Sequence, residues 1–123
     1  MPARKPEECD LLLLEALKKG DLDAAIAFYE PNASFVLDSG QVVTGRTAIR
    51  EALRGYLAVN GTMEVKAVPS GDGNLALLHG KFSGTIPGLD GKPIPFSGSS
   101  TEVVRRQPDG TWLFVIDNPH GGD

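Results

Sequence analysis

Two side chains in the second half of the chain have the chemistry for proton transfer, the carboxyl group of Glu102 and the imidazole of His79. If Asp90-Gly91 is a two-residue turn, the strands that flank it bring His79 directly opposite Glu102. An imidazole changes its charge near neutral pH, and a neighbouring carboxylate can fix its tautomer. The sequence therefore predicts Glu102 and His79 as catalytic residues, with an ordinary cross-strand polar pair as the alternative. A metal site would also need His120, without the usual local ligand spacing, so we expect no metal.

The register of the last hairpin determines what surrounds this pair. Residues 108–110 (PDG) fit a three-residue loop, which places Glu102 opposite Ile116. A two-residue turn would instead turn Asp117 towards the same face. Apolar walls with a few convergent polar groups are typical of a small-molecule pocket. The preferred register predicts such a face, with an apolar part followed by a polar part: Leu75, Leu77, Val104, Trp112, Phe114 and Ile116, then His79, Lys81, Ser100, Glu102 and Asn118.

The spacing of apolar side chains indicates which elements position these residues. Apolar residues recur at intervals of three and four in three segments, which predicts three amphipathic helices: 7–19, 21–29 and 46–58. Farther along the chain the period becomes two, which predicts four strands joined by short turns: 63–68, 74–86, 94–106 and 111–118. A short strand is also expected at 33–37, with a brief return through 42–43. Helices followed by a meander indicate an α+β fold, with the helices on one face of a curved sheet.

Length and composition bound the class of protein. The 123 residues, 41% of them hydrophobic and 23% charged, fit one globular domain over 1–123, with an ordered core at about 8–118. A net charge of −4 without a run of Lys or Arg argues against nucleic-acid binding. No apolar run is long enough to cross a membrane, and the single cysteine, Cys9, fits a reducing compartment. We therefore expect a cytoplasmic protein without a cofactor.

Four segments carry a family resemblance: 16–25 (ALKKGDLDAA), 29–33 (YEPNA), 45–50 (GRTAIR) and 109–112 (DGTW). In order and spacing they resemble the nuclear transport factor 2-like (NTF2-like) superfamily, which includes ketosteroid isomerases, SnoaL-like polyketide cyclases and scytalone dehydratases. The resemblance implies a cone-shaped, cystatin-like α+β fold, with three N-terminal helices packed on a curved, mainly antiparallel sheet. It is specific for the fold and does not specify the function, because enzymes, binding proteins and association modules all occur on this fold.

The catalytic residues of ketosteroid isomerases match this chain only in part. Their first helix contributes a Tyr to the oxyanion hole, and that position is Leu13 here. Their catalytic Asp falls on Leu37, next to Asp38, and their third group, an Asp on the penultimate strand, falls on Glu102. Steroid isomerisation is therefore not expected, and Glu102 is the carboxyl that the resemblance supports. The ligand-binding residues expected around it are Tyr29, Tyr56, Leu13, Leu37, Ile116 and Asn118.

These features favour a small-molecule-binding pocket protein of the SnoaL-like or ketosteroid isomerase-like type. Its chemistry would be that of a proton-transfer isomerase, cyclase or dehydratase with a small apolar or aromatic substrate. The alternative is a non-enzymatic module for dimerisation or protein association. Prolines and glycines between Phe82 and Phe96 predict either an irregular loop beside the pocket mouth or a rigid β-connection. The outer sheet face that follows from the register is too apolar for solvent, which predicts a homodimer through Ala76, Leu78, Val103, Leu113 and Val115.

Overall fold

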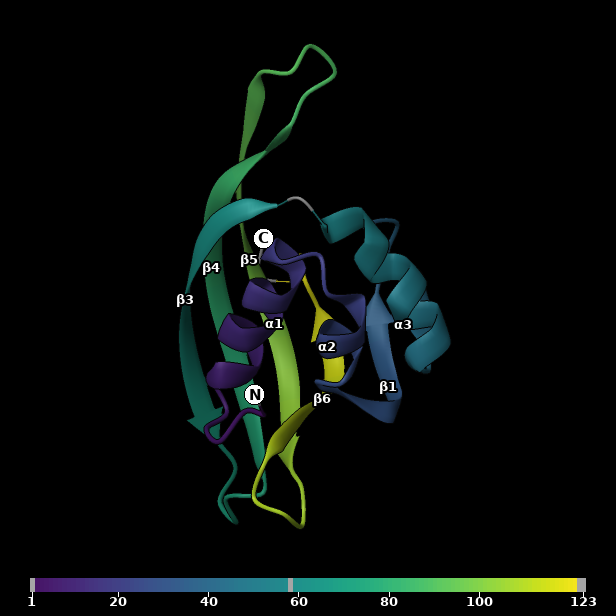
Figure 1. The fold of residues 1–123 in the computed structure, drawn as a ribbon. Coiled ribbons are helices and arrows are strands. Elements are labelled where there is room, and N and C mark those ends of the chain that lie inside the picture. Colours follow the sequence, from purple (N-terminus) through teal and green to yellow (C-terminus); the bar gives the residue numbers. More distant parts are fainter. Residues whose placement is uncertain (1, 58, 122–123) are drawn as a thin grey trace.

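The computed structural model describes residues 2–57 and 59–121. Its elements follow the order α1 (Glu8–Lys18), α2 (Leu22–Ile26), β1 (Tyr29–Val36), β2 (Val42–Thr44), α3 (Arg46–Leu53), the 3-10 helix η1 (Arg54–Tyr56), β3 (Asn60–Pro69), β4 (Leu75–Pro87), β5 (Pro93–Arg106) and β6 (Trp112–Asn118). The predicted α+β fold, with helices packed on a curved sheet, is confirmed (Figure 1). No helix in the described ranges is both long and apolar enough to cross a membrane.

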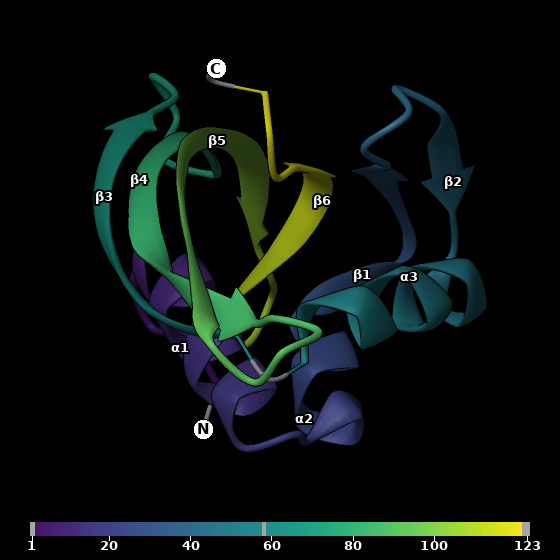
Figure 2. The same ribbon diagram turned by 90° about the horizontal axis from the view of Figure 1, so that it is seen from above.

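The strands form a single curved sheet in the order β2-β1-β6-β5-β4-β3. Neighbouring strands are antiparallel except β1 and β6, which run parallel. Figure 2 shows the sheet curling around the helices, with α1 against β3 and β6 and α3 against β1 and β2. One continuous cluster of buried apolar side chains packs between the helices and the sheet and occupies part of the space between them. The rest of that space, on the concave face of the sheet, holds the cavity described below.

Two of the predicted helices end earlier than their apolar spacing indicates. Helix α2 stops at Ile26, and Tyr29 is the first residue of β1, because Phe28 and Tyr29 pair with β6 instead. The carbonyl group of Phe28 accepts the N–H of Phe114 at 2.8 Å. Helix α3 ends at Leu53 and continues as η1, while the predicted end at Ala58 lies outside the described residues. Tertiary pairing thus overrides local helical periodicity at Tyr29.

The loop between β4 and β5 has three residues rather than the two expected. The N–H of Gly88 donates to the carbonyl of Lys92 at 3.0 Å, and the N–H of Gly91 donates to the carbonyl of Gly88 at 3.1 Å. Gly91 has φ +80°, the left-handed conformation that ends this type of loop. The extra residue shifts the register by one, so that Leu78 and not His79 opposes Glu102.

A one-residue shift turns every side chain of β4 to the other face relative to β5. Ala76 and Leu78, expected outside, are buried in the core, whereas Leu75 and Leu77, expected inside, are exposed. His79 and Lys81 also lie on the exposed face. The predicted opposition of His79 and Glu102 is therefore wrong, and so is the part of the expected dimer face that Ala76 and Leu78 would have supplied.

The segment between Phe82 and Phe96 is a β-connection, and the alternative of an irregular loop is wrong. Strand pairing continues to the end of the hairpin, where Pro87 opposes Pro93. The hairpin projects well beyond the body of the molecule (Figure 1), and the rings of Phe82 and Phe96 pack at its base with centroids 5.9 Å apart. This arrangement places two aromatic side chains next to the cavity described below.

A β-bulge at Val115 divides the β5–β6 ladder into two registers. Near the turn the register is the predicted one, with Val104 opposite Phe114. Beyond the bulge it shifts by one residue, so that Asp117 rather than Ile116 opposes Glu102. Phe114 and Asp117 are consequently both buried, while Ile116 is 43% exposed on the outer face. The carboxyl groups of Glu102 and Asp117, which the two possible turns would place in the pocket as alternatives, thus both point into it.

The β4 orientation can be tested by truncating two neighbouring leucines. Leu78→Ala should lower the free energy of unfolding by about 2–5 kcal/mol, because it opens a cavity in the core, and Leu77→Ala should lower it by less than about 1 kcal/mol in the monomer. Urea unfolding at several protein concentrations measures both, since any effect of Leu77 that comes from association depends on concentration. A larger, concentration-independent loss for Leu77→Ala would show that the register is the one expected from the two-residue turn.

Candidate functional site

An apolar cavity of about 580 Å³ lies between the helices and the concave face of the sheet. Its walls are mainly apolar and come from helices and strands alike: Leu13, Leu17, Phe35, Leu37, Leu53 and Met63. At one end, which we call the floor, lie the buried polar residues Asp10, Ser100, Glu102 and Asp117. At the other, which we call the mouth, lie the more accessible residues Asp38, Tyr56, Phe82, Phe96 and His120. A cavity of this size and composition fits a small organic molecule.

Three elements bring the floor carboxyl groups together. Glu102 points inward from β5 by strand alternation, and it is only 1% exposed. Asp117 points inward from β6 because of the bulge, and Asp10 comes from the first turns of α1. Asp10 lies three residues before Leu13, so it shares the buried face of the helix. The floor thus gathers acidic side chains from segments far apart in the sequence.

Tyr29 fixes the position of Asp117. Its hydroxyl group donates a hydrogen bond of 2.5 Å to Oδ2 of Asp117, and its ring packs on Phe114 with centroids 4.9 Å apart. Arg46 anchors the start of β1, because its Nε and Nη2 donate to the Tyr29 carbonyl at 2.9 and 2.7 Å. Burial, followed by the proximity of Asp117, raises the pKa of Tyr29 well above its usual value, so the phenol remains a donor.

Burial keeps protons on the floor carboxyl groups. It raises the pKa of Glu102 far above the usual range, and the neighbouring carboxyl groups of Asp10 and Asp117 raise it further. Burial also raises the pKa of Asp10. The pKa of Asp117 rises to about 7 through burial, although the Tyr29 hydrogen bond lowers it. The floor therefore holds one carboxyl that is protonated at neutral pH and one that titrates there.

The hydrogen-bond pattern agrees with a proton on Glu102. Apart from the neighbouring Ser100 hydroxyl, neither oxygen of Glu102, nor Oδ2 of Asp10, has a donor in the described part of the chain. Two ionised carboxylates offer acceptors only, so they cannot bond to each other. A protonated Glu102 supplies the missing O–H, with Asp10 as its acceptor.

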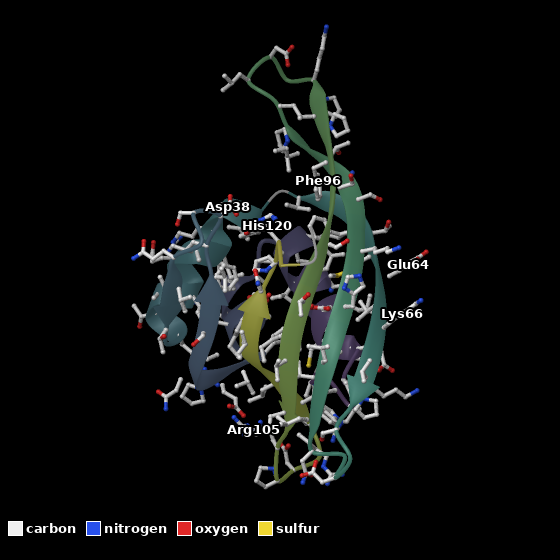
Figure 3. All side chains as sticks on the ribbon, turned by 180° about the vertical axis from the view of Figure 1, so that it is seen from behind. Asp38, Glu64, Lys66, Phe96, Arg105 and His120 are labelled. Carbon is white, nitrogen blue, oxygen red and sulfur yellow. The ribbon has the colours of Figure 1, made fainter. Side chains whose placement is uncertain are left out.

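The mouth holds a second polar group, formed by Asp38, Tyr56 and His120. Nε2 of His120 lies 2.7 Å from Oδ1 of Asp38, and the Tyr56 hydroxyl lies 3.2 Å from the same nitrogen. Figure 3 shows Asp38 and His120 close together at the end of the body from which the hairpin projects, with Phe96 at the base of that hairpin. The His120 ring also meets Phe82 edge-on, with centroids 6.4 Å apart. The chain after β6 thus borders the cavity entrance.

The predicted site residues divide into three groups. Glu102 lies on the floor, and Leu13, Leu37 and Tyr56 line the cavity; whether they bind a ligand, and whether Glu102 is catalytic, stays a prediction. Tyr29 lies behind the floor and acts through Asp117.

The remaining predicted site residues lie elsewhere. His79 and Ile116 lie on the outer face, for the reasons of register given above. Asn118 opposes Thr101, which belongs to the outer face of β5 because its neighbours Ser100 and Glu102 point inward. Asn118 is not among the described residues that line the cavity.

Sequence reasoning missed Asp10 and gave little weight to Asp117 and His120. A signal for Asp10 was present, because Asp10, Leu13 and Leu17 recur at helical spacing and belong to one face. The inward orientation of Asp117 depends on a bulge that no residue type in 112–118 predicts. The position of His120 at the mouth depends on where the C-terminal segment folds back. Among the described residues, no group of three or more His, Cys, Asp or Glu side chains is arranged to hold a metal ion.

Solved structures with this architecture include three that cover most of both chains. A ketosteroid isomerase-like protein from Erwinia carotovora atroseptica has TM-score 0.77 at 19% identity, covering 90% of this chain and 88% of its own. The association domain of CaMKII from C. elegans has TM-score 0.73 at 16% identity, with 88% and 86% covered. A cystatin-like fold protein of unknown function from Nostoc punctiforme has TM-score 0.70 at 16% identity, with 89% and 83% covered. At these identities the likeness establishes the fold.

No curated protein sequence matches the chain significantly. The family model described as the SnoaL-like domain matches residues 12–115, which span both the helices and the sheet. The cavity, its position between helices and sheet and the match along most of the sequence therefore agree: this chain belongs to the SnoaL-like family of NTF2-like domains.

Proposed function

We propose that this domain binds a small apolar molecule in its cavity and transfers a proton on it, with floor carboxyl groups as acid and base. The observation that carries the proposal is the burial of Glu102 and Asp117 side by side at the end of an apolar cavity. Their environments separate their pKa values, since Glu102 keeps its proton at neutral pH while Asp117 titrates at about 7. Two neighbouring carboxyl groups with different pKa values can divide the roles of acid and base.

The proposal gives one role to Glu102 and another to Asp117. Protonated Glu102 would donate a hydrogen bond to an oxygen of the ligand and stabilise negative charge that develops there. Ionised Asp117, held by Tyr29, would take a proton from a ligand carbon near that oxygen and return it to another atom of the ligand. Isomerisation and dehydration both need such an acid and such a base. The likeness to a ketosteroid isomerase-like protein supports this class of reaction without naming a substrate.

A nitrobenzisoxazole is a suitable probe, because removal of its ring C–H proton opens the ring and releases a coloured phenolate. Asp117→Asn should lower kcat/KM for this probe by about a hundredfold or more, since it removes the base. The rate of the unaltered chain should rise with pH and level off above about 7, as Asp117 ionises. His79→Ala, on the outer face, is the matched control and should retain full activity. Turnover by the unaltered chain that is no faster than that of Asp117→Asn would refute the assignment of the base.

The same buried carboxyl group should make folding stability fall with rising pH. In the unfolded chain Asp117 has its ordinary pKa of 3.8, whereas in the folded chain its pKa is about 7. The folded state thus binds more protons between these values, so its stability decreases from about pH 4 to about pH 7.

Asp117→Asn removes this titration and retains an acceptor for Tyr29. At about pH 8 the free energy of unfolding of Asp117→Asn should exceed that of the unaltered chain. The difference in free energy of unfolding between variant and unaltered chain should be more favourable to the variant at about pH 8 than at about pH 5, by on the order of 1–3 kcal/mol. Urea unfolding at the two pH values measures this, and Glu64→Gln, at an exposed position of β3, should show no such difference. Equal pH dependence of Asp117→Asn and the unaltered chain would show that Asp117 is not protonated in the fold.

A second function, association with another copy, is favoured by the outer face of the sheet. Side chains that oppose one another across four neighbouring strands form an apolar stripe: Val68, Leu77, Val103 and Ile116. Three of them are 43–62% exposed. A contiguous apolar row on the outer face of a sheet suits face-to-face packing of two sheets, and a two-fold pair would let the stripe cover itself. We propose a homodimer through this stripe, which the likeness to a kinase association domain also supports.

Sedimentation at micromolar protein concentration tests the dimer. The unaltered chain should sediment as a dimer, and Leu77→Asn should sediment as a monomer because a polar group interrupts the stripe. Leu89→Asn is the matched control, since Leu89 is fully exposed at the hairpin tip and should leave the dimer intact. A monomer from the unaltered chain, or a dimer from Leu77→Asn, would contradict the assigned face.

A further inference from the structure

The ionisable side chains that line the cavity are acidic apart from one histidine and one tyrosine. They are Asp10, Glu102 and Asp117 on the floor, and Asp38, Tyr56 and His120 at the mouth. None of the described lining residues is a lysine or an arginine. A ligand carboxylate or phosphate would find no cation to pair with on the floor and would be repelled by any ionised carboxylate there. The charge pattern therefore favours a ligand that is neutral or positively charged.

The floor also has more hydrogen-bond acceptors than donors. Oδ2 of Asp10, both oxygens of Glu102 and Oγ of Ser100 are buried, and in the described part of the chain they have no hydrogen-bond partner apart from one another. Glu102 and Ser100 are only 1% and 3% exposed, and both line the cavity. One proton on Glu102 and the Ser100 hydroxyl supply two donors, which leaves acceptor capacity unused. A ligand that brings several donors to one point would complete the floor.

An ammonium group has this property, because it carries a positive charge and up to three N–H donors and has no acceptor. A ligand hydroxyl brings one donor, and a carbonyl brings none. A metal ion is a poorer fit, since no three metal-binding side chains among the described residues are arranged to hold one. The apolar walls require that the cationic group be attached to an apolar body. Aromatic rings that line the cavity, Phe35, Tyr56, Phe82 and Phe96, offer faces that attract a cation as it enters.

We infer that the cavity takes an apolar amine, whose ammonium group lies on the floor among Asp10, Ser100, Glu102 and Asp117. The inference rests on the proposed function, because it requires a small-molecule cavity, and it deepens that function by naming the class of ligand. The amine nitrogen would occupy the place next to the acid and base that the proposed reaction uses.

Binding of an ammonium group should be linked to release of a proton. The titratable groups that face the floor are Asp10 and Cys9 from α1, Tyr29 from β1, Glu102 from β5 and Asp117 from β6. All are acidic groups, and burial raises the pKa of each. A cation placed among them favours their ionised forms. One carboxyl group therefore loses its proton to solvent and remains as the carboxylate partner of the ammonium.

The experiment compares three probes that differ only in their polar group: naphthylmethylamine, naphthylmethanol and naphthoic acid. Isothermal titration calorimetry at about pH 7 should give the amine a Kd at least about tenfold lower than that of the alcohol, and no detectable binding of the acid. Repeating the titration in two buffers of different ionisation enthalpy measures proton release. The amine should release up to one proton on binding, and the alcohol should release none.

Variants locate the effect on the floor. Glu102→Gln and Asp10→Asn should weaken binding of the amine by about tenfold or more and change binding of the alcohol little, because each removes a carboxyl group that can become the anionic partner of the ammonium and keeps the shape of the side chain. Glu64→Gln, an exposed acidic residue of β3, is the matched control and should change neither. If a floor variant fails to fold, the three probes with the unaltered chain still decide the question.

The outcomes separate this inference from the proposed function. Binding of the alcohol as tightly as the amine, or amine binding without proton release, would overturn the inference and leave the proposed cavity function standing. Absence of binding by all three probes would overturn the inference together with the cavity function. An amine preference that disappears in Glu102→Gln and persists in Glu64→Gln would support it.

Discussion

Three carboxyl groups are buried together at the end of an apolar cavity, and none of the described lining residues is a lysine or arginine that could neutralise them. Removing an ionised carboxylate from water is very unfavourable, so the fold must keep protons on the floor or supply donors to it. Tyr29 supplies one donor to Asp117, and a proton on Glu102 supplies another to Asp10. The elements around the floor are arranged so that each buried carboxyl group has a proton or a donor.

Two features of the sheet bring the donor and the carboxyl group together: one parallel strand pair and one β-bulge. Parallel pairing of β1 with β6 brings Tyr29 next to Asp117, and the bulge at Val115 turns Asp117 inward without turning Phe114 outward. Arg46 holds the start of β1 through its two hydrogen bonds to the Tyr29 carbonyl. A regular β6 would have presented either the apolar residues or the carboxyl group to the interior, but not both.

Strand alternation gives the two faces of this sheet separate tasks. The inner face carries the acidic floor, while the outer face carries the apolar stripe of Val68, Leu77, Val103 and Ile116. The proposed ligand chemistry and the proposed association therefore use opposite faces of the same strands. The position where the resemblance to ketosteroid isomerases would place a tyrosine is the apolar Leu13, and the polar side chain that α1 contributes to the floor is Asp10.

The sequence by itself determined the class of fold and the approximate place of most elements. Apolar spacing located α1 and the four long strands to within a few residues, and the segments around Gly20, Pro31 and Trp112 indicated the family. These features depend on local periodicity and turn chemistry, which neighbouring residues determine largely by themselves.

The tertiary structure alone decided the register, and with it most of the site. Asp90-Gly91 is compatible with a loop of two or three residues, and the choice between them moved His79 from the floor to the outer face. The bulge at Val115 likewise exchanged Ile116 for Asp117. Both choices depend on which side chains of the assembled sheet are buried together against the helices, so that Leu78 and not Leu77 enters the core. That total burial is a property of the assembled sheet, and no single hairpin contains it.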